Sequence, residues 1–327
     1  KDLTNANLSG VDLSGKDLTG TMLKGADLTG ANLSGVDLSG KDLTGTILKG
    51  ADLTGANLSG VDLSGKDLTN TNLSGVDLSD KDLTGTILMG TDLTDATLPS
   101  ISLSDKNFQR TVFDGLDLSG KDLSKSSLWD ISVKNTNLEN TNLTLADLRA
   151  VDFTKIKNKS LSGANLESAS FLLANLSGVN LSNVILDGTN FLQADLSGLD
   201  FTVTSKTSYH GTIFREANLS NSNFEDVILS PAEVLTATFK NKAHLKQDIR
   251  HYYHSKDLVW EIFGPGFDNI HIISTAANGN DLAVSYVFFN NFSHANLENA
   301  NFKNAGLWFV DFYSANLTNA NLSGADL

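Results

Sequence analysis

Residues 16–40 decide the fold, and they read KDLTG TMLKG ADLTG ANLSG VDLSG. Each five-residue block has leucine in third place, and most have Asp or Asn before it and Ser or Thr followed by Gly after it. Neither the 3.6-residue period of a helix nor the two-residue period of a strand would keep these leucines on one side. The chain is therefore predicted to turn a corner after every fifth residue, where glycine relieves the backbone.

The same pattern covers most of the chain. Apolar residues recur every five positions from Leu3 to Phe153, and a small or β-branched residue stands two places before most of them. A second, longer period lies on top, because the block that starts at Lys16 returns almost unchanged at Lys41 and begins again at Lys66. Such regular repeats predict a solenoid whose units each contact only their neighbours.

This motif resembles the signature of the pentapeptide-repeat family, and the resemblance covers the chain except mainly residues 240–281. It implies an all-β solenoid, a right-handed quadrilateral β-helix with four sides and about 20 residues per coil. In such a coil the leucine and the small residue point inward, and Asp or Asn, Ser or Thr, and Gly point outward. Stacked coils would pair their backbones about 4.8 Å apart.

Breaks in the phase divide the chain into four predicted regions. These are a regular β-helix (1–153), a divergent β-helix with loop insertions (154–239), a helix-plus-strand insertion (240–281) and C-terminal coils (282–327). The phase breaks after Phe153, and again around Tyr209 and His210, with three extra residues each time. It is then expected to continue through Val234 and Phe239.

The largest departure, residues 240–281, is predicted to contain an α-helix over 241–263. Gly264-Pro265-Gly266 should end that helix, residues 269–275 resemble a strand, and residues 278–280 a tight turn. Apolar residues at helical spacing form a stripe that would cap the solenoid or dock a protein partner: Leu245, Ile249, Tyr252, Val259 and Phe263.

Composition excludes several classes of function. The net charge is -14 and the pI near 4.7, which opposes binding of nucleic acid through its phosphates and favours cations or a basic partner. The chain has no cysteine, so disulfides and cysteine-based metal sites are excluded. No apolar run reaches the ~18 residues of a membrane-spanning helix, so membrane insertion is not expected.

Two sets of residues are candidate metal ligands. Asp42, Asp62 and Asp82 occupy the same place in every fourth repeat and should stack on one side, where Ca²⁺ would relieve their repulsion. His251 and His254 are close enough on a helix to share a divalent ion. The alternative is that the repeat itself supplies the aspartates and that the histidines belong to the polar face of a docked helix. No cofactor is otherwise expected.

Two further features of the repeat are ambiguous. Asn-x-Ser/Thr triplets point outward as glycosylation requires, although the repeat consensus itself generates them, and they include Asn7, Asn32, Asn57, Asn72, Asn175 and Asn321. An extracellular or cell-surface location is favoured over the cytoplasm, but the compartment stays open. Lysines also occupy inward positions, where either their stems bend out or their amines find carbonyl or carboxylate oxygens: Lys1, Lys41, Lys81 and Lys121.

The sequence favours a non-enzymatic structural or interaction scaffold, since no nucleophile elbow, phosphate loop or HExxH motif is present. Lys1 and Leu327 both fall within repeats, and neither end has a predicted capping helix. We therefore expect end-to-end stacking of an acidic rod, docking of a protein partner, or further sequence beyond the ends. The alternative, implied by the resemblance, is that the chain imitates duplex DNA and binds a topoisomerase or another DNA-binding protein.

Overall fold

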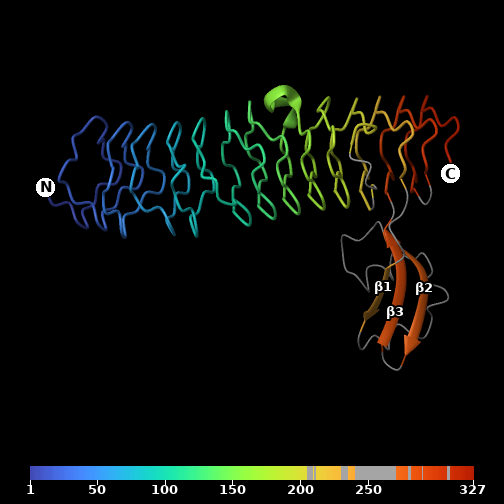
Figure 1. Cartoon of the computed structure of the whole chain (residues 1–327), viewed down its shortest axis with the longest axis horizontal. Coiled ribbons are helices and arrows are strands. Elements are labelled where there is room, and N and C mark those ends of the chain that lie inside the picture. The colour runs from blue at the N-terminus through green and yellow to red at the C-terminus, as the bar shows by residue number, and fades with distance from the viewer. Residues whose placement is uncertain are drawn as a thin grey trace. The chain divides into compact units, whose positions relative to one another are not determined.

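The computed structural model describes residues 1–204, 209, 211–229, 235–239, 270–278, 281–288, 290–307 and 310–327. The chain divides into two compact units, unit 1 (Lys1–Asn180) and unit 2 (Leu181–Leu327). Both units contain a stack of coils, and unit 2 also contains a three-stranded sheet (Figure 1).

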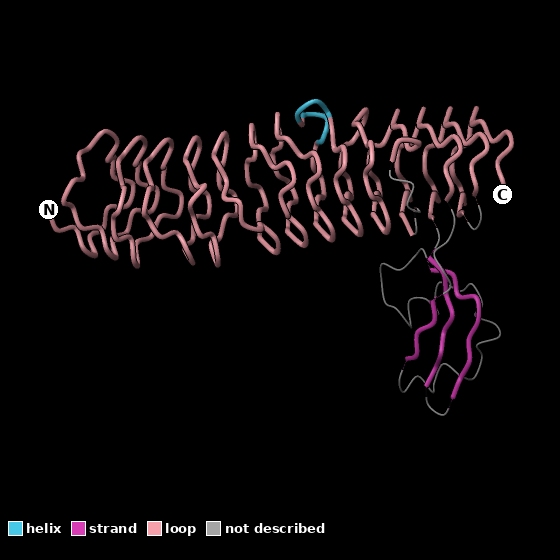
Figure 2. Tube along the Cα trace, in the orientation of Figure 1, coloured by secondary structure: helices cyan, strands magenta, loops and turns pink. Residues whose placement is uncertain are grey.

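The coils of unit 1 pair through parallel bridges between equivalent residues of successive coils, such as Asn32 with Asp52 and Asp52 with Asn72. Bridge positions follow one another once per pentapeptide, and the partner of each lies four pentapeptides further on, so a coil has four sides. This confirms the predicted β-helix solenoid. Each bridge involves single residues and not continuous strands, so Figure 2 draws nearly all of the coil backbone as loops and turns.

Each corner is a tight turn that the repeat encodes. The amide of Ala31 donates to the carbonyl of Leu28 at 3.0 Å, and Gly30 between them has a φ of 63°. A positive φ at the third residue of such a turn is the mark of a type II turn. Asn70 has a φ of 58° at an equivalent corner, which fits the tolerance of Asn for this region.

Leucines fill most of the core of unit 1, with a few phenylalanines such as Phe108 and Phe153, whereas phenylalanines stack in rows in the core of unit 2. Leu28, Leu33 and Leu53 have no exposed surface. In unit 2 the rings form two rows of stacked neighbours with centroids 4.3–5.5 Å apart: Phe191, Phe214, Phe292 and Phe312 in one row, and Phe201, Phe224 and Phe302 in the other. Stacked and edge-to-face contacts of this kind stabilise the coils beyond burial alone.

The first two breaks in phase enlarge one coil each. In unit 1, Asn142 bridges Asn165, which lies three positions beyond the ordinary partner, and the extra residues form the 3₁₀ turns η1 (Phe153–Lys155) and η2 (Lys157–Lys159). In unit 2, Asn190 bridges Ile213 across the same interval. Each break therefore adds three positions to a coil, as the spacing predicts.

The third break in phase is a long segment that lies outside the coils, and the coils before and after it pair in the ordinary register. Ile213 bridges Asn291, far along the sequence, and Asn291 then bridges Asp311 at the ordinary interval of one coil. Between them lie β1 (Leu235–Phe239), β2 (Ile270–Asn278) and β3 (Asp281–Phe288), which form an antiparallel sheet in the order β1-β3-β2. The strand predicted over 269–275 corresponds to β2, and Asn278 pairs with Asp281 where the tight turn was predicted.

The expectation that the repeat phase continues to Phe239 is wrong. Phe239 ends β1 and pairs with Leu282 of β3. Residues 235–239 read LTATF, which alternates apolar and hydroxyl residues with the two-residue period of a strand. Val234 and the predicted helix over 241–263 lie outside the described residues.

The four sides of unit 1 pair to different extents. We call residues 21–25, 41–45, 61–65, 81–85 and 101–105 the Asp42 face, and residues 11–15, 31–35, 51–55, 71–75, 91–95 and 111–115 the opposite Asn32 face. Every step of the Asn32 face from residue 12 to residue 112 has both backbone hydrogen bonds, such as Leu33 N–H to Asp52 O at 2.7 Å and Asp52 N–H to Ala31 O at 2.8 Å. Within the fully described stretch 1–204, the four steps of the Asp42 face from residue 22 to residue 102 have neither bond.

The size of the inward residue before each Asp or Asn explains this difference. On the Asn32 face these residues are small or hydroxylated: Ala31, Ala51, Thr71, Thr91 and Thr111. On the Asp42 face the steps that lack bonds carry Lys41, Val61, Lys81 and Ile101. A bulkier side chain in a close-packed core forces the neighbouring backbones apart.

The same correlation holds on the other two sides of unit 1 up to residue 137. Bulky inward residues such as Lys66 and Val76 accompany lost pairing there, and small ones such as Ala56 accompany complete pairing. The exceptions lie beyond the stretches that define the two named faces, where the step at Lys121 keeps one bond and the step at Ile131 keeps both.

Candidate functional site

The outward Asp residues of the repeat are held in a fixed geometry by their own turns. In Asp62, Oδ1 accepts hydrogen bonds from the amide of Ser64 at 2.9 Å and from its hydroxyl at 2.7 Å. Asp12 makes the same two contacts with Ser14, at 3.0 and 2.7 Å. These Asx turns leave the second carboxylate oxygen to point outward on the side of the coil.

The turns also keep the carboxylates ionised. The hydroxyl and then the amide of Ser64 hold the pKa of Asp62 below its usual range, and the pKa of Asp12 is lowered in the same way by Ser14. A hydrogen bond to the charged form of an acid favours that form. Because the repeat supplies such a turn on most sides, unit 1 carries ordered negative charge along its faces.

Most of the inward lysines have half-buried side chains whose amines are hydrogen-bonded. The Nζ atoms of Lys41, Lys66 and Lys106 each donate to the carbonyl of a leucine in the preceding coil, at 2.7, 2.7 and 2.8 Å. Lys121 donates to Pro99 O at 2.7 Å. Burial lowers the pKa of Lys66 and that of Lys106 from the usual lysine value, against the pull of nearby aspartates.

Lys81 differs from this pattern. Its side chain is only 3% exposed, and its amine lies 2.9 Å from a carboxylate oxygen of the neighbouring Asp80. Lys1 is exposed. Of the two outcomes left open by the sequence, Lys41 and Lys121 therefore find carbonyl oxygens, Lys81 finds a carboxylate, and Lys1 stays in solvent.

Inward threonines donate to the same kind of acceptor as the lysines, the backbone carbonyl of a leucine in the preceding coil. Thr71 Oγ1 donates to Leu48 O at 3.0 Å and Thr91 Oγ1 to Leu68 O at 2.9 Å, again in the preceding coil. Each of these leucine carbonyls also accepts the amide that closes its turn, as Leu48 O does from Ala51 at 3.0 Å. A carbonyl has two lone pairs, so polar inward residues satisfy themselves without disturbing the corner.

The predicted metal ligands are only partly placed by the structure. Asp42, Asp62 and Asp82 occur at equivalent positions of successive coils on the Asp42 face, as expected. Among the described residues, no group of three or more His, Cys, Asp or Glu side chains is arranged to hold a metal ion. His251 and His254 lie outside the described residues, as do Leu245, Ile249, Tyr252, Val259 and Phe263.

The asparagines of the predicted glycosylation triplets are already engaged in Asx turns. Asn57 Oδ1 accepts the amide of Ser59 at 3.1 Å, and its Nδ2 donates to Asp37 Oδ1 at 3.0 Å. Oδ1 of Asn7, Asn32, Asn72, Asn175 and Asn321 likewise accepts the amide two residues later. Glycosylation of these residues stays a prediction.

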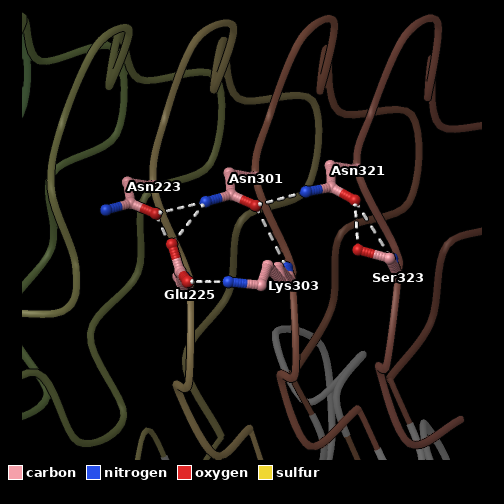
Figure 3. Close-up of polar contacts among 6 residues, drawn as sticks. All are labelled: Asn223, Glu225, Asn301, Lys303, Asn321 and Ser323. Atoms are coloured by element: carbon pink, nitrogen blue, oxygen red, sulfur yellow. Dashed lines mark hydrogen bonds and ion pairs between the residues drawn. The ribbon is translucent and has the colours of Figure 1, made fainter.

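Unit 2 carries ladders of side-chain amides that sequence reasoning missed. Asn301 Nδ2 donates to Asn223 Oδ1 at 3.1 Å, and Asn321 Nδ2 donates to Asn301 Oδ1 at 3.1 Å (Figure 3). Beside this ladder, Lys303 Nζ donates to Glu225 Oε1 at 2.7 Å, and Asn301 Nδ2 also reaches Glu225 Oε2 at 3.1 Å. The ladder joins the coil before β1 to the two coils after β3.

A signal for these ladders does exist in the sequence. The Asp of the repeat is replaced by Asn in consecutive coils, at Asn223, Asn301 and Asn321, but the intervening residues hide the spacing. An Asn can both donate and accept, whereas an Asp can only accept. Ladders of this kind therefore require Asn in at least one of two neighbouring coils.

Among the described residues, no helix is long and apolar enough to cross a bilayer. The sequence matches no curated protein. The solved structures to which the chain is similar include HetL, a pentapeptide repeat protein involved in heterocyst differentiation regulation from the cyanobacterium Nostoc sp. strain PCC 7120, which is 22% identical over 90% of this chain and 89% of its own, with a TM-score of 0.27. Full-length QnrB1, a plasmid-mediated fluoroquinolone resistance protein, is 18% identical over 66% and 83%, with a TM-score of 0.17.

A trypsin-treated form of QnrB1 is 19% identical over 61% of this chain and 75% of its own, with a TM-score of 0.21. The family model described as pentapeptide repeats matches in eight copies, at residues 2–40, 26–65, 42–75, 67–105, 91–130, 131–157, 174–202 and 291–327. These matches span more than half of the sequence and coincide with the coils of both units. The chain therefore belongs to the pentapeptide-repeat family.

Proposed function

We propose that this chain is a non-enzymatic scaffold that binds a protein partner carrying a basic surface. The observation that carries this proposal is the ordered negative charge on the sides of unit 1, where Asx turns fix carboxylates such as Asp12 and Asp62 and lower their pKa values. Charge arranged on a rigid surface steers an oppositely charged partner and fixes its register.

The scaffold would also self-associate end to end, with a second copy of the chain as its partner. In the last described coil Phe312, Leu317 and Leu322 are only half-buried, whereas Phe292 and Phe302 in the preceding coil have no exposed surface. A further coil would cover these side chains and pair with the free backbone. That coil could belong to another copy or to the same polypeptide.

A DNA-mimicking binder of a topoisomerase or another DNA-binding protein is the alternative. The net charge of -14 has the sign that such a mimic needs. It differs from the main proposal in the identity of the partner, since the basic surface would then be a DNA-binding site.

Binding to a panel of basic and acidic proteins, measured by biolayer interferometry at low and at high salt, tests the main proposal. We expect association only with basic proteins, weakening at the higher salt because exposed charges are screened. Loss of supercoiling by a topoisomerase in the presence of excess chain would favour the DNA-mimicking form. Absence of salt-sensitive binding to any basic protein would contradict the proposal.

A further inference from the structure

The Asp42 face differs from the other sides of unit 1 because the backbone bonds at its aspartate positions are missing over four consecutive steps, although Gly25 N–H still donates to Thr44 O and Gly65 N–H to Thr84 O, both at 2.9 Å. In the four steps from residue 22 to residue 102, the amides of Leu23, Leu43, Leu63 and Leu83 donate to no described residue. The carbonyls that would receive them belong to Asp42, Asp62, Asp82 and Ser102, and these accept no backbone amide either. Unpaired backbone groups on a sheet-like surface are ready to pair with an incoming partner.

The carboxylates of this face also lack the neutral neighbours found elsewhere. On the Asn32 face the outward residues alternate between Asp and Asn, as in Asp52, Asn72 and Asp92. On the Asp42 face three aspartates follow one another, and the negative charge of Asp62 acts against the ionised form of Asp82. Like charges this close destabilise one another unless a cation lies between them.

Lysines of unit 1 relieve part of this repulsion, because the charges of Lys24, Lys66 and Lys106 help to lower the pKa values of the three aspartates. Lys41, Lys66 and Lys106 direct their amines to leucine carbonyls inside the coil. Within residues 1–204, the one ion pair that an aspartate of this face forms joins Lys24 Nζ to Asp42 Oδ2 at 3.8 Å, with both side chains more than half exposed. In the same stretch neither Asp62 nor Asp82 forms an ion pair, and their outward oxygens remain available.

The surface is also hollowed at this position. A depression lies between residues 40–47 and 60–67, and its lining includes the carboxylates of Asp42 and Asp62 and the amide-bearing backbone of Leu43. Lys41 and Lys66 line the depression as well, but their amines donate to the carbonyls of Leu18 and Leu43. The carboxylates of Asp42 and Asp62 in this lining suit a side chain that is positively charged and rich in hydrogen-bond donors.

We propose that the Asp42 face is the docking surface for a lysine- or arginine-bearing segment of the partner protein, whose cations lie along Asp42, Asp62 and Asp82. This inference rests on the proposed function and names its site. Charge complementarity identifies the occupant. A metal ion is a poorer fit, because no three carboxylates converge among the described residues. The acidic chain also repels nucleic acid.

A pair of matched triple variants tests the assignment. Asp42→Asn/Asp62→Asn/Asp82→Asn neutralises the proposed surface, and Asp12→Asn/Asp52→Asn/Asp92→Asn makes the same change in charge on the Asn32 face. Both variants should fold, because Asn32 Oδ1 accepts the amide of Ser34 at 3.0 Å just as the aspartates accept theirs. The probe is a fluorescein-labelled Arg-Gly-Arg-Gly-Arg-Gly-Arg peptide, measured by fluorescence anisotropy at low salt on the whole chain.

We expect the first variant to weaken binding about tenfold, from roughly 0.5 kcal/mol for each exposed pair, and the second to weaken it less than about twofold. In the unaltered chain, titration should shift the NMR amide signals of Leu43 and Leu63 more than those of Leu33 and Leu53. Equal weakening by both variants would overturn the assignment of this face and leave the acidic scaffold standing. No binding of the peptide by the unaltered chain would overturn the scaffold as well.

Discussion

At the scale of single residues, the inward position two places before each leucine decides how closely two coils approach. Ala, Thr and Ser at this position accompany complete pairing, and Val, Lys, Ile and Leu accompany lost pairing in nearly every step up to residue 131. The leucine itself is the same in both cases. The small residue of the motif is therefore as important for the backbone as the leucine is for the core.

Replacing a small inward residue on the closed side tests this rule. Ala51→Val should push Asp52 away from Leu33 and Ala31, and overpacking of this kind costs about 1–3 kcal/mol. Urea denaturation followed by circular dichroism measures the loss. Val61→Ile adds a methylene where the face is already open, so it should cost less. Equal losses in the two variants would show that backbone separation is not what the inward residue controls.

The amide ladder of unit 2 makes a second prediction for a single side chain. Asn301→Asp replaces the amide that donates to Asn223 and Glu225 with a carboxylate that only accepts. The free energy of unfolding should fall by about 1–3 kcal/mol. Asn321→Asp at the exposed end of the ladder loses one such bond and should cost less. A neutral effect of Asn301→Asp would mean that the ladder contributes nothing to stability.

At the scale of elements, the coil was predictable from the sequence because its period is local. Five-residue spacing fixes which residues face inward, and Gly or Asn usually stands at the corner, although Leu145, Ala150 and Leu173 adopt a positive φ there as well. The unequal pairing of the faces is not local, since Lys41, Val61 and Lys81 lie on one side only because each coil consists of four repeats. Comparing the inward residue of every fourth repeat, instead of every repeat, would have revealed the open side.

Sequence reasoning failed where a spacing of five arose without the rest of the motif. Val234 and Phe239 have the right interval, yet Phe239 belongs to β1 because residues 235–239 alternate like a strand. The candidate docking surface was seen only as three stacked aspartates. Its open backbone depends on the steric effect of residues that the motif treats as interchangeable.

The coils before and after the sheet pair in the ordinary register. This predicts that the segment between them, which contains β1, β2 and β3, is dispensable for folding. Since Ile213 bridges Asn291 as directly as Asn291 bridges Asp311, deleting residues 230–287 should return the two coils to ordinary spacing. The thermal midpoint should stay within about 5 °C. Deleting residues 227–287 instead removes the buried core residue Leu229 as well and should prevent folding. Aggregation of the first deletion variant would contradict this view of the register.

At the scale of the whole molecule, the turns that hold the aspartates make stability depend on acidity. Hydrogen bonds lower the pKa values of carboxylates such as Asp12, Asp27 and Asp62 in the folded chain. The unfolded chain then binds more protons than the folded chain around the ordinary aspartate pKa of about 3.9. The stabilising contribution is complete above that pKa and is lost as the pH falls through the lowered folded values.

Urea denaturation should therefore show a steady fall in the free energy of unfolding from about pH 5 to about pH 3. An Asp12→Asn/Asp27→Asn/Asp62→Asn variant removes three of these titrating groups and keeps the turns, so its fall should be shallower. A free energy that rises on acidification would mean that relief of repulsion between like charges outweighs the hydrogen bonds of the turns.

The central claim is that unit 1 is a four-sided coil with the Asn32 face paired and the Asp42 face open. Residue-resolved amide hydrogen exchange measures it directly, because exchange is slow only where an amide is hydrogen-bonded within stable structure. We predict strong protection for Leu33 and Leu53, whose amides donate to Asp52 and Asn72, and rapid exchange for Leu43 and Leu63. Equal protection of the two pairs would contradict the open face and the docking surface built on it.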